Sequence, residues 1–158
     1  MKKIGLISPS ILMVVLLSFS MSFFSVKCDK EELIKIKGID FLIGKDLSIK
    51  NPINKEIINN ELKPNIWAII PFTFSLLGIG FYFFSTSFKK YLIIGIFSLV
   101  SILSLLFLRH NIKYEIENNK DIILDLCTQW GFIFITILLL INSLLCFIIY
   151  FIMKKTYN

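Results

Sequence analysis

The chain has 158 residues, of which 56% are hydrophobic and 16 are Phe, and its mean hydropathy is +0.77. A soluble domain of this length has too little interior to bury so much apolar surface, which excludes an ordinary water-soluble globular fold. The formal net charge of +6 would suit a nucleic-acid-binding protein, but the lysines are placed as a membrane-topology signal and argue against that class.

Four uncharged apolar runs predict membrane-spanning helices. A helix needs about 20 apolar residues to cross the hydrocarbon core, and the runs cover residues 4–26, 66–88, 91–108 and 130–153. In lipid the backbone polar groups must be satisfied within the segment or in a closed barrel, and the runs lack the alternation of barrel strands. We therefore expect an all-α membrane protein, a four-helix bundle that forms one domain over residues 1–158.

The first run also resembles a secretory signal peptide, because Lys2 and Lys3 precede an apolar stretch. The run 4–26 is longer than a usual signal core, and small-x-small cleavage sites near Ser20 are weak. Cys28 follows a lysine, whereas a lipidated cysteine would follow a small residue. From its length we expect an uncleaved helix.

The lysines distinguish the two sides of the membrane. The loops 27–65 and 109–129 hold all 11 acidic residues and 11 of the 17 basic ones, so they carry no net charge. The short segments contain no acid and hold the other lysines, which are Lys2, Lys3, Lys89, Lys90, Lys154 and Lys155. Excess lysine in short segments marks the cytoplasmic side. We expect a multi-pass protein of the cell (inner) membrane with both termini cytoplasmic and no nucleic-acid partner.

Short strands are expected in the two outer loops. Residues 32–37 alternate apolar and polar and are expected to pair with 25–28 across a turn at 29–31, and residues 112–117 alternate in the same way. These patterns predict a small extracytoplasmic antiparallel sheet that joins the two loops.

The remaining outer-loop residues suggest other elements. Gly38 and Gly44 are expected to permit sharp turns. Residues 50–63, rich in Asn and Lys, predict an irregular excursion, and 121–127 predict a short helix.

Amphipathic side chains mark the expected membrane boundaries. Trp67 and Trp130 fall at the outer boundary and Tyr91 and Tyr150 at the inner one, where aromatic rings of this kind prefer to lie. Arg109 can keep its stem in lipid while its guanidinium reaches the headgroups. Anchoring explains all five residues without a binding role.

Polar residues inside the expected spans predict helix packing. Gly95, Ser98, Ser101 and Ser104 form a track of small residues that lets helices approach closely. Asn142 lies near the middle of the last run, where a buried Asn more often bonds to a neighbouring helix than to a ligand. The span interiors contain no Asp, Glu, Lys or His, which argues against an autonomous ion-coupled transporter.

Three cysteines are present, and two lie near the outer membrane boundary. A disulfide between Cys28 and Cys127 is expected to be geometrically plausible, because the predicted sheet brings the two loops together in an oxidising compartment. The alternative is two free thiols. Cys146 lies deep in the last run and is interpreted as a small apolar residue.

Motifs that would specify a reaction are missing from the sequence. It contains no glycine-rich phosphate loop, no metal-spaced Cys or His set and no nucleophile triad pattern, and His110 is its one histidine. We therefore expect no enzymatic activity, no cofactor and no metal.

The first loop carries a family resemblance. Residues 24–28 read Phe-Ser-Val-Lys-Cys, and residues 37–44 read Lys-Gly-Ile-Asp-Phe-Leu-Ile-Gly. This opening resembles a group of uncharacterised bacterial membrane proteins, in which a first helix ends in a Phe-rich x-Val-x-Cys segment followed by a Gly-x-Asp turn. The motif covers about the first 45 residues, and Phe41 stands where that pattern favours Leu. The resemblance implies a four-helix layout and no particular activity.

The functional expectation is a non-enzymatic subunit or scaffold of a membrane complex, with an extracytoplasmic recognition surface. Its expected partners are the lipid bilayer and other membrane proteins or itself. One alternative is a channel or transport component that oligomerises around Ser98, Ser101 and Asn142. Another is a claudin-like adhesion protein, which the layout resembles by topology alone, since the claudin tryptophan-and-paired-cysteine signature is missing.

Overall fold

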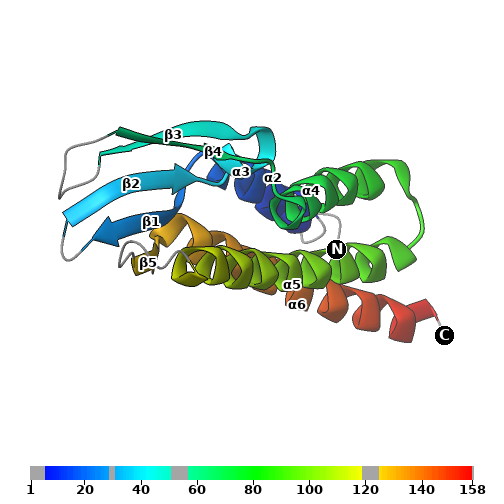
Figure 1. Cartoon of the computed structure of the whole chain (residues 1–158). Helices are drawn as coiled ribbons and strands as arrows, with labels where there is room; N and C mark the ends of the chain where they lie inside the picture. The colour runs from blue at the N-terminus through cyan, green and yellow to red at the C-terminus, as the bar shows by residue number, and fades with distance from the viewer. Residues whose placement is uncertain (1–5, 29–30, 51–56, 119–124, 158) are drawn as a thin grey trace.

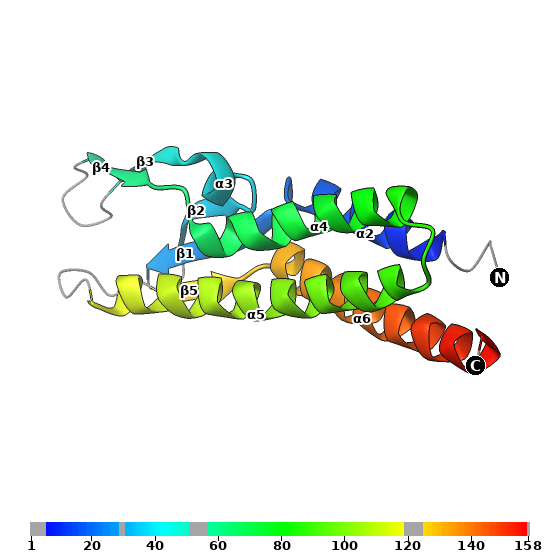
Figure 2. The same ribbon diagram turned by 90° about the vertical axis from the view of Figure 1, so that its right-hand side faces the viewer.

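The computed structural model describes residues 6–28, 31–50, 57–118 and 125–157. Four helices run side by side, and the strands gather at one end of the bundle (Figures 1 and 2). The helices are α2 (Ile7–Ser18), α4 (Ile66–Phe84), α5 (Lys89–Asn118) and α6 (Trp130–Tyr157). Within the described chain, α4, α5 and α6 are long and apolar enough to cross a membrane, whereas α2 has 12 residues.

The first predicted helix, residues 4–26, is wrong in its extent. The helix α2 ends at Ser18, and strand β1 (Ser22–Cys28) follows after a short turn. The carbonyl oxygens freed at the break accept bonds from the next segment: Ile39 N–H donates to Phe19 O (2.8 Å), and Gly38 N–H to Met21 O (3.1 Å). Hydropathy did not foresee the break, because an apolar strand buried in protein has the same composition as a helix in lipid.

A three-stranded antiparallel sheet lies at the end of the bundle. Its order is β2 (Glu31–Lys37), β1, β5 (Asp125–Thr128), with Ser25 opposite both Lys35 and Cys127. The hairpin expected from residues 25–28 and 32–37 is confirmed. The sheet therefore links a segment just after the first helix to one just before the last.

The third strand comes from residues other than those predicted. Residues 112–117 belong to α5, which continues to Asn118. Leu108 and Ile112 share one face of this helix, and both are buried. The strand β5 covers Asp125–Thr128 instead, so the short helix expected at 121–127 is wrong for 125–127. Its first part, 121–124, lies outside the described residues.

A second, two-stranded sheet leaves the first loop. It pairs β3 (Lys45–Lys50) with β4 (Ile57–Leu62), so the excursion expected at 50–63 is partly regular. The helical turn α3 (Asp40–Ile43) connects β2 to β3, and Gly44 ends it with a φ of +81°, a conformation that favours glycine. The sharp turn expected at Gly44 is therefore present.

Aromatic rings form the core where the sheet meets the helices. Each of Phe19, Phe23, Phe24 and Phe41 is almost completely buried. Ring centroids of neighbouring pairs lie 5.1–6.4 Å apart, in tilted or edge-to-face arrangements that favour aromatic attraction. The rings that join this cluster are Phe19, Phe23, Phe24, Phe41, Phe72 and Phe132, so the residue that follows α2 meets β1, α3, α4 and α6 here.

The short turn between α4 and α5 is held by Lys90. Its ammonium donates to the carbonyl oxygens of Tyr82 and Ser85, both at 3.0 Å, and lies 4.4 Å from the centre of the Tyr82 ring. A cation at the carboxyl end of a helix satisfies free carbonyls and interacts favourably with the helix dipole. The neighbouring Lys89 is exposed.

We expect Lys90→Met to lower the free energy of unfolding by about 1–2 kcal/mol, because charge-assisted bonds to two carbonyls are lost. Thermal unfolding in detergent measures the change. The matched control is Lys89→Met, which removes the same charge from the same turn and is expected to leave the unfolding midpoint unchanged. Equal effects of the two variants would mean that charge alone, and not the helix cap, stabilises the turn.

Candidate functional site

A buried polar contact joins α5 to α6 in the middle of the bundle. Asn142 is 0% exposed, and its amide nitrogen donates to Ser98 Oγ at 2.9 Å. Ser98 in turn donates to the carbonyl oxygen of Ile94 at 3.1 Å. Among the described residues, nothing donates to Asn142 Oδ1. The contact therefore fixes the two helices relative to each other and leaves one unsatisfied acceptor.

The small residues of α5 lie at helix contacts. Gly95 packs against the ring of Phe147, and its carbonyl accepts a bond from Ser143 Oγ at 3.2 Å. Ser101 and Ser104 are also buried. Ser101 donates within its own helix, to Phe97 O at 2.7 Å, whereas Ser104 donates across to α4, to Trp67 O at 2.8 Å. The track thus faces α6 and α4 within the same chain.

One void inside the bundle is too narrow to act as a path. A narrow void between α2, α4, α5 and α6 has no room for a water molecule. Its lining residues are Leu12, Phe74, Ser75, Ile94, Phe97, Ser98, Ser101 and Leu139. Each of the three serines already donates to a carbonyl of its own helix. Around this void the bundle is therefore packed rather than hydrated.

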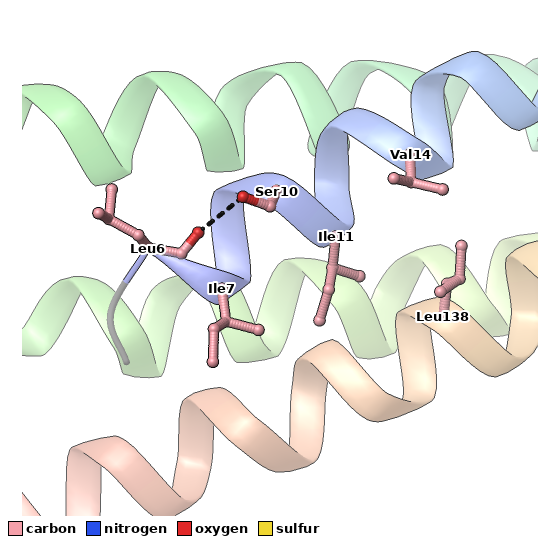
Figure 3. A pocket seen from close by; sticks show the side chains of 6 residues that line it. All are labelled: Leu6, Ile7, Ser10, Ile11, Val14 and Leu138. Atoms are coloured by element: carbon pink, nitrogen blue, oxygen red, sulfur yellow. Dashed lines mark hydrogen bonds between the residues drawn. The ribbon is translucent and has the colours of Figure 1, made fainter. Parts of the chain in front are cut away.

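An apolar groove of about 320 Å³ lies between α2 and α6 (Figure 3). Its lining residues are Leu6, Ile7, Ser10, Ile11, Val14 and Leu138. The hydroxyl of Ser10 donates to the carbonyl of Leu6 at 3.0 Å, so the one polar side chain of the lining is already engaged. The groove suits an apolar chain and offers no group that would recognise a polar substrate.

The five residues interpreted as membrane anchors occupy different environments. Trp130 is 78% exposed at the start of α6, and Arg109 is exposed in α5. Trp67 is half-buried and stacks on Phe107 with ring centroids 5.0 Å apart. Tyr91 is buried beside Tyr82. Tyr150 is half-buried and stacks on Phe88 with ring centroids 5.9 Å apart.

Of the two alternatives for Cys28 and Cys127, the structure does not support the disulfide. Cys127 is a free cysteine, and its register partner in β1 is Ser25. Cys28 lies three residues farther along that strand, a distance of about 10 Å at a strand rise of about 3.3 Å per residue. A disulfide needs Cα atoms within about 7 Å. The other cysteine, Cys146, is buried, and its sulfur lies 3.3 Å from Ser8 Oγ.

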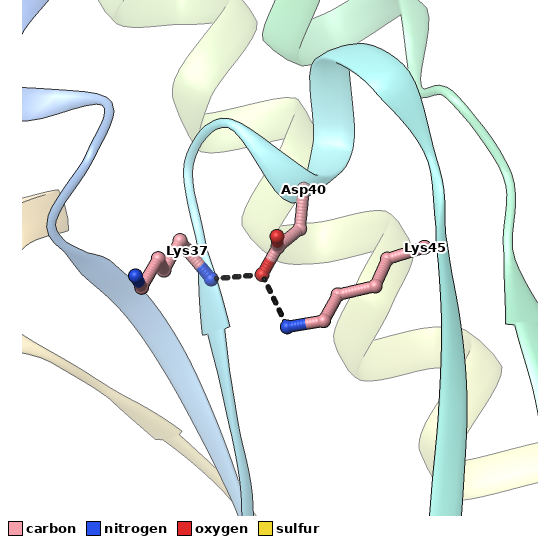
Figure 4. Close-up of polar contacts among 3 residues, drawn as sticks. All are labelled: Lys37, Asp40 and Lys45. Carbon is pink, nitrogen blue, oxygen red and sulfur yellow. Dashed lines mark hydrogen bonds and ion pairs between the residues drawn. The ribbon is translucent and has the colours of Figure 1, made fainter.

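A buried carboxylate that the sequence analysis did not single out as a site lies at the junction of β2 and α3 (Figure 4). Asp40 Oδ2 accepts a bond from the backbone N–H of Lys37 at 2.8 Å and lies 3.5 Å from Lys45 Nζ. Among the residues whose side-chain burial is described, Asp40 is the one charged residue that is buried; the other buried polar groups are serines and Asn142. The Gly-Ile-Asp sequence at 38–40 was the available signal. The contacts of Asp40 are those of a residue that stabilises a turn.

We expect Asp40→Ala to lower the free energy of unfolding by about 1–2 kcal/mol, because the Lys37 N–H loses its acceptor in a partly buried site. Asp40→Asn is the matched control. Its side-chain oxygen can still accept that bond, so only the ion pair with half-exposed Lys45 is lost, at about 0.2–1 kcal/mol. Urea unfolding in detergent compares them. An Asn variant as unstable as the Ala variant would assign the stabilisation to charge.

No family model, curated protein or solved structure matches the chain. The resemblance of its first loop to uncharacterised bacterial membrane proteins therefore stays a prediction. Within the described part of the chain, no three His, Cys, Asp or Glu side chains group as a metal site would require. The function is therefore inferred from the arrangement of the helices and the sheet.

Proposed function

We propose that this protein is a four-span protein of the cell (inner) membrane that acts as a non-enzymatic subunit or scaffold. Its termini lie in the cytoplasm, and the sheet end forms an extracytoplasmic recognition surface. The observation that carries the proposal is the contrast between the two ends of the bundle. One end is a turn and a helix tail, and the other gathers all the described strands (Figure 2).

The outer faces of the helices support the membrane location. They expose large apolar side chains along α4, α5 and α6, among them Leu76, Leu77, Phe83, Ile96, Leu103, Leu106, Ile137, Leu140, Ile141 and Leu144. Monomeric soluble proteins rarely expose apolar surface on this scale. The serines and Asn142 are turned inward instead, which is how helices pack in a solvent as apolar as leucine.

The direction of α2 supports a fourth crossing. It begins toward the bundle end that holds the α4–α5 turn and ends toward the sheet, and it packs against α4 and α6 (Figure 2). Its 12 residues span about 18 Å of the roughly 30 Å core. Non-helical backbone at membrane depth is tolerated where protein buries it, and Phe23, Phe24 and Ser25 of β1 are fully buried.

Open strand edges support a recognition role. In the described residues, β2 and β5 each pair with β1 along one edge, and no other strand pairs with their second edge. An open edge presents unpaired N–H and C=O groups that can take up an added strand from a partner. The β2 strand, with seven residues, is the longer template, although the N–H of its last residue, Lys37, is taken by Asp40.

The channel alternative loses support from the buried contacts. An oligomeric pore would need Ser98, Ser101 and Asn142 on an outer face of the chain. Ser98 and Asn142 instead bond to each other between α5 and α6, and Ser101 is 1% exposed. We therefore favour the subunit or scaffold role.

Protease protection of terminal epitope tags tests the topology. In intact cells, tags at the N- and C-termini are expected to be protected from added protease, whereas a tag inserted after Asn54, in the first outer loop, is expected to be cleaved. Cleavage of the N-terminal tag alone would leave three spans and overturn the fourth crossing.

Site-specific photocrosslinking in the native membrane tests the recognition role. A photoreactive residue at Leu33 in β2 or Thr128 in β5 is expected to give a discrete crosslinked protein. The matched control is Leu103, which is exposed on the middle of α5 and is expected to give none. Purification in mild detergent with mass spectrometry identifies the partner. A protein that purifies alone and crosslinks to nothing from both edge positions would overturn the role.

A further inference from the structure

The helical turn α3 lies beside the beginning of α4, at the depth expected for a membrane boundary. The backbone N–H of Asn65 donates to the carbonyl of Phe41 at 2.8 Å, and Trp67 follows two residues later in the first turn of α4. Both the contacts between the two helices and Figure 2 place α3 against the side of this turn. Tryptophans concentrate at the headgroup level of membranes, so α3 lies near that level if the helices span.

The outer face of α3 is apolar. Phe41 and Asp40 are buried, whereas Ile39 is 41% exposed and Ile43 is 74% exposed. Ile39 and Ile43 are four residues apart and so share one face of the turn. Met21 and Ile66 are also exposed, and their backbone lies beside this segment: Gly38, next to Ile39, donates to Met21 O, and Asn65, next to Ile66, donates to Phe41 O. We call these four residues, Met21, Ile39, Ile43 and Ile66, the α3 patch.

Exposed lysines flank the segments that carry this patch. Lys37, Lys45 and Lys63 are exposed, and the ion pair with Asp40 holds Lys45 next to α3 (Figure 4). The exposed acids Asp46 and Glu61 lie opposite each other one position farther along the β3–β4 hairpin. An apolar patch flanked by basic residues matches the boundary between the acyl chains and the phosphates of a bilayer.

We propose that the α3 patch is an interfacial anchor that inserts into the leaflet at the sheet end, with Lys37, Lys45 and Lys63 at the lipid phosphates. The occupant is the phospholipid bilayer, and the inference rests on the membrane location proposed above. The patch is continuous with the lipid-facing surface through Ile66, the first residue of α4. Such an anchor would fix the depth of the β1–β2 hairpin at the membrane boundary.

Fluorescence quenching at Ile43 tests the anchor. The Ile43→Trp variant is made in a Trp67→Phe, Trp130→Phe background and reconstituted into phosphatidylcholine–phosphatidylglycerol vesicles. Lipids brominated near the top of the acyl chain are expected to quench most of its emission, and aqueous iodide is expected to quench little. Glu61→Trp on the β3–β4 hairpin is the water-exposed control, with the opposite pattern. Leu103→Trp is the control for the spanning helices, and lipids brominated near the end of the acyl chain are expected to quench its emission.

The outcomes separate the anchor from the membrane location. If iodide strongly quenches Trp at position 43 while brominated lipid quenches Leu103→Trp, the anchor is overturned and the proposed membrane location still stands. Protection of position 43 from both quenchers would also overturn it, because a protein surface would then cover the patch. A Leu103→Trp variant that brominated lipid does not quench would overturn the membrane location, and the anchor with it. Circular dichroism of each variant confirms the fold beforehand.

Discussion

Phe24→Ala is expected to lower the free energy of unfolding by about 3–5 kcal/mol, as large-to-small changes of buried aromatic residues do. Phe24 is fully buried, and its ring centroid lies 5.1 Å from that of Phe132 and 5.8 Å from that of Phe41. The substitution therefore removes the ring that joins β1 to both α6 and α3. Neighbouring side chains come from a rigid helix and a sheet, so the cavity cannot close fully.

Thermal unfolding in detergent, with hydrogen exchange of the β1 and β5 amides, measures this loss. The matched control is Phe84→Ala at the end of α4, where the side chain is 91% exposed. It is expected to leave the unfolding midpoint nearly unchanged. The exchange of β1 amides should rise in the Phe24 variant and stay constant in the control. Equal unfolding midpoints for the two variants would contradict the position of the core.

Asn142→Asp is expected to have the next largest effect, a loss of about 2.5–3.5 kcal/mol, the cost of an acidic residue at the centre of a membrane helix. Asn142 is fully buried between α5 and α6, and no lysine or arginine lies within the span to pair with a carboxylate. The unpartnered Oδ1 shows that the site offers no spare donor among the described residues. The measurement is the unfolding midpoint in detergent at neutral pH.

Asn142→Leu is the control for this prediction, because leucine has the same branched outline as asparagine without its polar atoms. It removes the unsatisfied acceptor and one bond worth about 0.6 kcal/mol on average in a membrane protein, while Ser98 keeps its bond to Ile94 O. We expect nearly unchanged stability. A Leu variant as unstable as the Asp variant would point to a ligand or a packing role that the Ser98 bond does not explain.

Parts of the candidate sites were readable from local pattern. The small-residue track on α5 and Asn142 were predicted as packing residues, and the structure places them at contacts with α4 and α6. The importance of Asp40 was not predicted. A single acid in a lysine-rich loop resembles a solvated residue, and its burial depends on how α3 folds back on the end of β2, where the Lys37 N–H donates to its carboxylate.

The possible disulfide between Cys28 and Cys127 is a second case that local sequence did not decide. Sequence placed Cys28 and Cys127 in two loops that do meet in one sheet. Register alone decides whether two residues on neighbouring strands are opposite, and a displacement of three residues removes the pairing. No local property of either cysteine carries that register, because it depends on long-range contacts such as that of Phe24 with Phe132 in α6.

The sequence by itself determined the three long apolar helices and the β1–β2 hairpin. Both follow from local terms: the length of an uncharged run decides whether a helix can cross lipid, and a period of two decides the faces of a strand. Only the tertiary structure decided where α2 ends, how far α5 continues and which residues form β5. At these places the local sequence is compatible with either a helix or a strand. The choice depends on backbone partners and buried surfaces supplied by distant segments: Gly38 and Ile39 for the end of α2, and β1 for β5.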